Sequence, residues 1–266
     1  MHIVVCIKQV PDTTEVKINP ETNTLVREGV ASIINPFDTY AIEEGLRLKE
    51  KFGGKVTVLT MGPPQAREAL KEAVAMGADE AILLSDRAFA GSDTWATAYT
   101  LSHAIRRLGT LDLVLCGKQA IDGDTGQVGP GIARQLGLPQ LTYVCRILEI
   151  DPAARSIRVE RLLEEGREVV TCTLPALLTV VKDINQPRYP TFMGIRRATR
   201  MDIPVWDSTT LNEANPAYLG LGGSPTQVVR IFNPPPRSGK VELLTGESPA
   251  ETAAQLAERL LADKVI

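Results

Sequence analysis

The first 140 residues alternate between short β-rich runs and stretches with helical periodicity, and this alternation limits the folds open to the chain. The predicted strands cover residues 3–10, 55–62, 81–85 and 111–117, and the predicted helices cover residues 37–54, 63–79, 93–109 and 126–136. The strands are continuously apolar, which is typical of a parallel sheet covered on both faces. Because crossovers between parallel strands are right-handed, the sequence predicts a doubly wound, mostly parallel, Rossmann-like α/β fold.

The pattern changes after Pro139. Three strand-like runs follow, TYVCRILEID, SIRVERLLEEG and REVVTCTLPALLTVV, and they are joined by short turns at 152–155 and 165–168. No helical pattern separates these runs, so we expect antiparallel hairpin strands added to the sheet. They complete a predicted first domain, which covers residues 1–184.

A proline-rich segment begins near residue 185. Nine of the eighteen prolines lie between Pro187 and Pro249. A segment of this composition buries little surface by itself. We therefore expect residues 185–266 to form an extended arm that lies on a partner. It ends in a helix over 249–263, whose start has the capping-box residues Ser248 and Glu251.

Composition argues against several functional classes. The net charge of −3 gives no basic footprint for nucleic acid, and no run approaches the roughly 18 apolar residues of a membrane-spanning helix. The sequence shows no secretory signal, and its four cysteines have no CxxC spacing. We therefore expect a cytoplasmic protein with reduced thiols. The two histidines lack metal-ligand spacing, so we expect no metal site.

Polar loops follow four of the predicted strands. They are KQVPDT (8–13), TMGPP (60–64), DRAFAGSDT (86–94) and GKQAIDGDTGQVG (117–129). In an open parallel sheet, ligands bind beyond the carboxyl ends of the strands, where these loops should meet. In the fourth loop Gly123, Gly126 and Gly129 would let backbone N–H groups at a helix N terminus approach a phosphate.

Two interpretations of this glycine-rich loop are open on motif grounds. One is a cradle for a phosphate or pyrophosphate, with Asp122 reaching a ribose hydroxyl. The other is an ordinary strand-to-helix connection. In either case Asp124 or Thr125 would cap the helix. The loop matches neither G-x-G-x-x-G nor G-x-x-x-x-G-K-[ST], so no standard fingerprint decides between them.

Several segments resemble the β subunit of electron transfer flavoproteins, in the same order and over nearly the whole chain. They are CIKQVPDT, INPFDTYAIEEGLRLKE, AMGADEAILL, GKQAIDGDTGQVGP, VERLLEEGREVVTCTLPALLTVV and INQPRY. The resemblance implies a heterodimer with a flavin-carrying α subunit, around which the C-terminal arm would lie. It also implies a nucleotide at the strand ends, which is AMP in conventional members and FAD in electron-bifurcating members.

The loop DGDTGQVGP, together with VPDT, GSDT (91–94) and LGGSPT (221–226), resembles the electron-bifurcating group, although that group usually carries alanine in place of Gly126. The resemblance thus implies FAD, with AMP as the alternative. It implies NADH as the hydride donor. The electrons would divide between an α-subunit FAD serving an acyl-CoA dehydrogenase and a low-potential acceptor, ferredoxin or flavodoxin. A universal-stress-type nucleotide-binding module is the alternative of another class, and it would lack the proline-rich arm.

The resemblance also implies roles for individual residues. The expected cofactor contacts are Cys6, Lys8, Asn35 and Met61 on the adenosine side, Asp93 and Thr94 on the flavin side, and Gln119, Asp122, Gly123, Asp124, Thr125, Gly126, Gln127 and Val128 in the loop. The N–H groups of the last three would hold phosphates. Phe192, in TFMGIR, occupies the place of an apolar anchor that inserts into an acyl-CoA dehydrogenase. The alternative for Phe192 is a packing residue within the arm.

Overall fold

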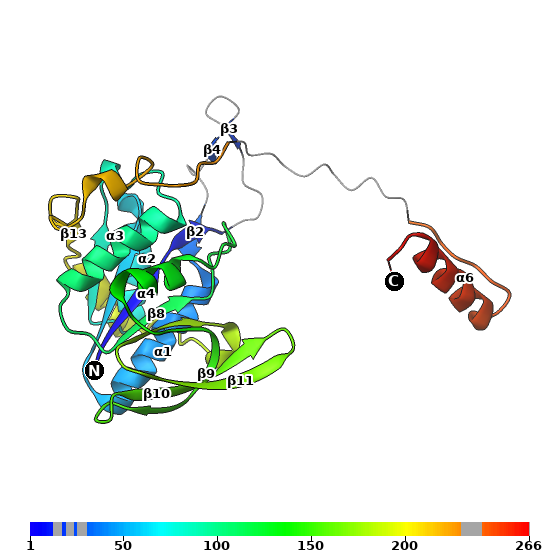
Figure 1. Ribbon diagram of the computed structural model, residues 1–266, viewed down its shortest axis with the longest axis horizontal. Helices are drawn as coiled ribbons and strands as arrows, with labels where there is room; N and C mark the ends of the chain where they lie inside the picture. Colours follow the sequence, from blue (N-terminus) through cyan, green and yellow to red (C-terminus); the bar gives the residue numbers. More distant parts are fainter. Residues whose placement is uncertain (13–17, 20–23, 26–30, 230–240, 266) are drawn as a thin grey trace. The chain divides into compact units, whose positions relative to one another are not determined.

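A large, mostly parallel sheet organises the chain (Figure 1). The computed structural model describes residues 1–12, 18–19, 24–25, 31–229 and 241–265. The strand order is β11-β10-β9-β12-β8-β1-β6-β7-β13. These strands are β1 (His2–Ile7), β6 (Lys55–Met61), β7 (Glu80–Leu84), β8 (Leu113–Gly117), β9 (Gln140–Asp151), β10 (Ser156–Leu163), β11 (Gly166–Thr173), β12 (Ala176–Val180) and β13 (Val205–Trp206). The predicted α/β class, with its antiparallel additions, is confirmed.

Helices cover both faces of this sheet. They are α1 (Pro36–Phe52), α2 (Arg67–Met76) and α5 (Phe192–Arg200) on one face, and α3 (Thr94–Arg107) and α4 (Val128–Leu136) on the other. Strand β1 is continuously apolar because both of its faces are buried. Ile3 and Val5 belong to the core beneath α1 and α2, whereas Val4 belongs to the core beneath α3 and α4, and all three are fully buried.

The chain reverses its direction of travel across the sheet between β1 and β8. From β1 it moves outward through β6 to β7, and α3 then carries it back to β8 on the other side of β1. Strand β1 pairs in parallel with both neighbours, with Val4 opposite Thr57 in β6 and opposite Val114 in β8. Such a reversal is a topological switch point, and the crevice outside it is the usual ligand position in open α/β sheets.

The three strand-like runs after Pro139 form four strands. Strands β9, β10 and β11 pair antiparallel, as predicted, and Figure 1 shows this ribbon extending from one side of the sheet. The last run divides near Pro175, and its second half is β12, which lies between β8 and β9 and is parallel to both. The parallel pairing of β12 was not predicted, because parallel strands are usually connected through a helix and no helical pattern precedes this run.

The segment from residue 185 to 229 packs on the sheet and helices formed by the preceding residues. Arg188 forms ion pairs with Glu43 and Glu50 of α1, α5 packs on α2, and β13 pairs with β7. The division between compact units falls at Arg230/Ile231, later than the composition change near residue 185. The prolines 234–236 lie outside the described residues.

The second unit, Ile231–Ile266, contains α6 (Pro249–Ala262). The predicted capping residues act at its start, where the Ser248 hydroxyl accepts a hydrogen bond from the Glu251 N–H at 3.3 Å. The Glu251 carboxylate in turn accepts from the Glu247 N–H at 2.8 Å. Leu256 and Leu261 are exposed within this unit. None of the described helices is long and apolar enough to cross a membrane.

Candidate functional site at the carboxyl edge of the sheet

A pocket of about 90 Å³ lies at the carboxyl ends of β1 and β6. It is lined by Lys8, Gln9, Val10, Pro11, Ser32, Met61, Gly62, Pro63, Gln65, Ala66 and Asp122. Sequence reasoning named three of these residues, Lys8, Met61 and Asp122, which come from loops far apart in the chain. The other lining residues were not predicted individually. Their residue types, such as proline and glutamine, are common in loops and do not distinguish a residue that lines a pocket.

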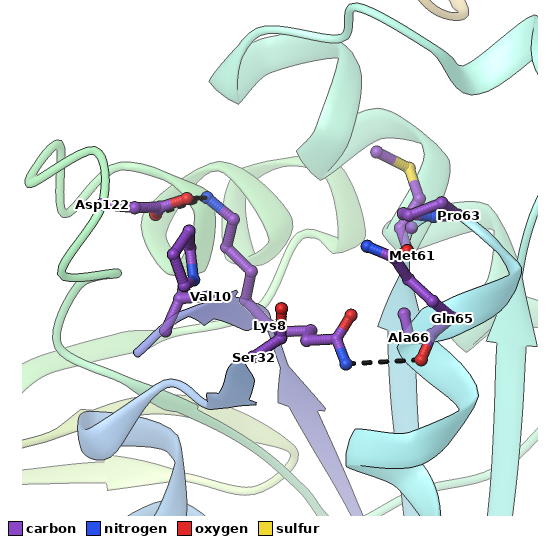
Figure 2. Close-up of a pocket in the computed structure, with 11 residues that line it drawn as sticks. Lys8, Val10, Ser32, Met61, Pro63, Gln65, Ala66 and Asp122 are labelled. Carbon is purple, nitrogen blue, oxygen red and sulfur yellow. Dashed lines mark hydrogen bonds and ion pairs between the residues drawn. The ribbon is translucent and has the colours of Figure 1, made fainter. Parts of the chain in front are cut away.

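Lys8 and Asp122 form an ion pair at the edge of this pocket. Figure 2 shows the Lys8 ammonium reaching Asp122, with Met61, Pro63 and Gln65 on the other side. The Lys8 Nζ lies 2.6 and 2.8 Å from the two Asp122 carboxylate oxygens. Asp122 was expected to reach a ribose hydroxyl. A carboxylate has spare lone pairs, so the pair with Lys8 leaves that role open.

Asn35 and Gln119 help to fix the loop that follows β8. The Asn35 side chain is 1% exposed. It donates to the Gln119 carbonyl at 2.8 Å and accepts from the Ile121 N–H at 3.0 Å. The Asn35 amide is therefore used within the chain, and Asn35 does not line the pocket. Cys6 is also buried, opposite Cys116 in the core, and does not line it either.

The glycine-rich loop is an ordered turn. The Gln119 side chain donates to the Asp124 carboxylate at 2.6 Å, and the Asp124 N–H donates to the Ala120 carbonyl at 2.9 Å. Asp124 has φ +52° and Gly126 has φ +61°, in the left-handed region that glycine adopts without cost. Gly123 and Thr125 are exposed on the same turn.

The start of α4 differs from the prediction that Asp124 or Thr125 would cap it. The cap residue is Gln127, and no side chain caps the helix. Among the described residues, none accepts a hydrogen bond from the N–H groups of Gly126, Gln127 and Val128. Uncapped N–H groups combined with the helix dipole attract an anion. The chain therefore fits a phosphate at this point.

Gly129 has a packing role that was not predicted. A side chain at this position would meet the Thr179 methyl group at 2.6 Å, so the glycine allows α4 to pack closely on β12. Gly131, two residues further on, similarly allows α4 to approach Ala98 of α3. Of the three glycines proposed for ligand approach, Gly126 alone has a positive φ angle.

Asp93 caps the start of α3, and both of its carboxylate oxygens have partners within the chain. One carboxylate oxygen accepts from the N–H groups of Trp95 and Ala96, each at 3.0 Å. The other accepts from the N–H and hydroxyl of Thr226, at 3.0 and 2.8 Å. Partial burial alone would raise the pKa of Asp93, but these hydrogen bonds outweigh it and hold the pKa below its ordinary value. The carboxylate thus caps α3 with one oxygen and anchors Thr226 of the LGGSPT segment with the other.

Phe192 is the first residue of α5 and is 80% exposed. Thr191 caps the helix by accepting from the Gly194 N–H at 3.0 Å, and Gly194 lies close against the backbone of Ala75 in α2. Met193 and Ile195 are also exposed. The Phe192 ring belongs to neither of the two described hydrophobic cores.

The fold and this edge define an α/β protein that can hold a phosphorylated ligand at a topological switch point. The family model for the electron transfer flavoprotein domain matches residues 22–211. The chain belongs to the electron transfer flavoprotein family and corresponds to its β subunit, which implies an α subunit as partner. The universal-stress-type alternative is set aside by this membership.

Individual relatives agree with this assignment. The chain is 53% identical to the electron transfer flavoprotein subunit beta of Thermoanaerobacterium thermosaccharolyticum over 268 residues, covering 100% of both chains. It is 51% identical over 267 residues to the caffeyl-CoA reductase-Etf complex subunit CarD of Acetobacterium woodii, again covering 100% of both. It is 50% identical to protein FixA of Azotobacter vinelandii over 265 residues, covering 98% of this chain and 94% of FixA.

Proposed function

We propose that this chain is the β subunit of an electron-bifurcating flavoprotein and binds FAD at the carboxyl edge of its sheet. The observation that carries the proposal is the set of free N–H groups at Gly126, Gln127 and Val128, beside a loop whose sequence resembles that of the bifurcating group. The relative CarD, named as part of a reductase-Etf complex, supports a role in a larger redox assembly.

In this proposal the chain binds and orients the cofactor, and its side chains form no covalent bond with it. The N–H groups at the start of α4 would hold the pyrophosphate, and the paired Lys8 and Asp122 would offer a hydrogen-bond donor and acceptor at the pocket edge. A bound flavin supplies hydride acceptance from NADH and one-electron transfer. Electrons then reach an acyl-CoA-type dehydrogenase through the α subunit, and reach ferredoxin or flavodoxin separately.

One observation favours AMP as the second candidate. The pocket of about 90 Å³ is far smaller than the roughly 300–1,000 Å³ of a typical cofactor cleft. A mononucleotide needs less additional space from the partner subunit than a dinucleotide. We therefore keep a conventional subunit, which binds AMP and passes single electrons, as the alternative.

The nucleotide content of the co-expressed α–β pair decides between the two candidates. We expect two FAD per dimer, measured by absorbance after denaturation, with no AMP released. One FAD and one AMP per dimer would contradict the bifurcating proposal and support the conventional one. A separate measurement, reduction of the bound flavin when NADH is added to the purified pair, tests whether NADH is the electron donor.

Phe192 supports a proposal about docking. An exposed phenylalanine at a helix start, flanked by exposed Met193, leaves apolar area in water unless a partner covers it. We propose that Phe192 inserts into the partner dehydrogenase. We also propose that the second unit, with exposed Leu256 and Leu261, contacts the α subunit. Deleting residues 241–266 should then weaken association of the pair, measured by gel filtration.

A further inference from the structure

Asp38, which the sequence analysis did not single out, joins the carboxyl ends of the two strands at the switch point. It lies in the first turn of α1 and is 6% exposed. One carboxylate oxygen accepts from the Lys8 N–H at 2.7 Å, directly after β1. The other accepts from the Gly117 N–H at 3.1 Å, at the end of β8. One buried side chain therefore sets the spacing between the two strand ends.

The residues joined by Asp38 lead directly to the candidate site. Lys8 carries the ammonium that pairs with Asp122. Gly117 begins the segment that Asn35 holds at Gln119 and Ile121, and this segment continues to the start of α4. The packing around the carboxylate is close, because a side chain at Gly117 would overlap the Asp38 carboxylate and Phe37. A shift of Asp38 therefore moves the Lys8 backbone and the loop together.

We propose that Asp38 is a positioning residue of the nucleotide site, whose ionised carboxylate holds Lys8 and the 117–128 loop in binding geometry. The proposal rests on the proposed nucleotide-binding function of this edge. It assigns to Asp38 no contact with the nucleotide. The role needs two good acceptor oxygens. A protonated carboxyl keeps only a weak acceptor at its hydroxyl, and an amide has a donor in that place, so one N–H loses most or all of its hydrogen bond.

The protonation state of Asp38 is adjustable near neutral pH. Burial raises the pKa of Asp38 to about 7, against the hydrogen bonds from the Lys8 N–H, the Asn35 side chain and the Gly117 N–H that lower it. The other titratable groups close to it are the Lys8 ammonium after β1 and the Cys116 thiol of β8. The hydrogen bond with Cys6, followed by burial, raises the pKa of Cys116, so this thiol stays neutral over the same range.

The test measures FAD affinity of the α–β pair by equilibrium dialysis between pH 6 and pH 8. Asp38→Asn imitates the protonated state at every pH. We expect its FAD affinity at this site to be about tenfold weaker than wild type at pH 8. Wild-type affinity should fall toward that of the variant as the pH drops to 6, while the variant shows a flat profile. Gly117→Ala, which displaces the same carboxylate from the other side, should weaken binding as well.

Asp112→Asn is the matched control. Asp112 lies just before β8 and accepts from the His2 N–H at 2.9 Å, so it joins the same two strands at their opposite ends. We expect Asp112→Asn to leave FAD affinity unchanged. Equal affinity and equal pH profiles in Asp38→Asn and wild type would overturn the positioning role alone. A wild-type pair that binds neither FAD nor AMP at this subunit would overturn the proposed function on which the role depends.

Discussion

The hydroxyl of Thr94, the first residue of α3, donates a hydrogen bond of 3.0 Å to the side chain of Gln127, the residue before α4. The N-terminal ends of the two helices therefore lie next to each other, and their partial positive charges act on one region. Asp93 neutralises part of this charge at α3 by capping it, whereas α4 has no side-chain cap. An anion at this edge is thus directed to α4.

Gly126→Val is expected to empty the proposed FAD site. Gly126 has φ +61°, which a β-branched side chain does not tolerate, so the N–H groups at the start of α4 would turn away. Loss of two charge-assisted hydrogen bonds at roughly 1.5–3 kcal/mol each is enough to release the cofactor. Flavin stoichiometry of the purified pair should fall from two to one. Gly126→Ala should have a smaller effect.

Gly123→Ala is the control for this experiment. Gly123 lies on the same loop without a positive φ, and an added side chain would meet nothing within 4 Å. Its flavin content should match that of wild type. Two bound flavins and normal NADH oxidation in Gly126→Val would show that the loop is only a connection.

Phe192→Ala is expected to slow electron delivery to the dehydrogenase. Truncation of an apolar anchor in a partner pocket costs about 2 kcal/mol or more of binding. Flavin content and NADH reduction should be unchanged, because Phe192 lies on α5 and not at the carboxyl edge. Val205→Ala, at an exposed position on β13, serves as the control. Unchanged dehydrogenase coupling, measured by steady-state transfer at varied partner concentration, would rule out Phe192 as the anchor.

Arg188→Lys is expected to destabilise the segment before α5. The Arg188 guanidinium binds Glu43, which is 3% exposed, and also Glu50. A lysine cannot bridge both carboxylates, so the pair with the exposed Glu50 is lost while Arg47 still pairs with Glu43, at a cost of about 1 kcal/mol. Hydrogen exchange of residues 185–200 should accelerate, and the unfolding temperature should fall. Arg259→Lys, whose ion pairs are on the exposed α6, should change neither.

Asp38 also predicts how stability depends on pH. Its pKa is about 7 in the folded chain against 3.8 for the ordinary group, so the folded state holds the proton over a range in which the unfolded state has lost it. The contribution of Asp38 to stability is therefore fully present below pH 3.8 and declines as pH rises to 7, by roughly 4 kcal/mol in total. Urea unfolding of wild type relative to Asp38→Asn should show this decline between pH 4 and pH 7. A constant difference would contradict the raised pKa.

Local patterns predicted the parallel core of the fold. The strands flanking β1 and the helices α1 to α4 are continuous apolar or helical stretches, and their order follows from the handedness of crossovers. The place of β12 between β8 and β9 could not be predicted in the same way, because the partner of a strand is set by packing between segments far apart in the chain. The start of α4 was misjudged for a local reason, since Asp124 adopts a positive φ and bonds to Gln119.

The sequence predicted which loops meet at the site better than it predicted the roles of individual side chains. Lys8, Met61 and Asp122 meet in one pocket. Asn35 instead binds the backbone of the loop after β8, and Asp93 binds the backbone of Thr226. Each of these side chains has a partner more than 80 residues away, and no spacing in the sequence reveals those contacts. The residues NPFD (35–38) have the pattern of a helix start. This pattern does not indicate that the Asp38 side chain joins the ends of two strands.

The position of β12 has a consequence for synthesis of the chain. Strand β8 is made first, then β9, β10 and β11, and β12 inserts between β8 and β9 only when residue 180 has been made. Until then one edge of β8 has no partner, and the face of α4 that packs on Thr179 is uncovered. Pairings between distant segments form slowly. We therefore expect a nascent chain that ends before residue 176 to contain the assembled strands β1, β6 and β7. In that chain the N-terminal part of α4 would still lack its packing against β12.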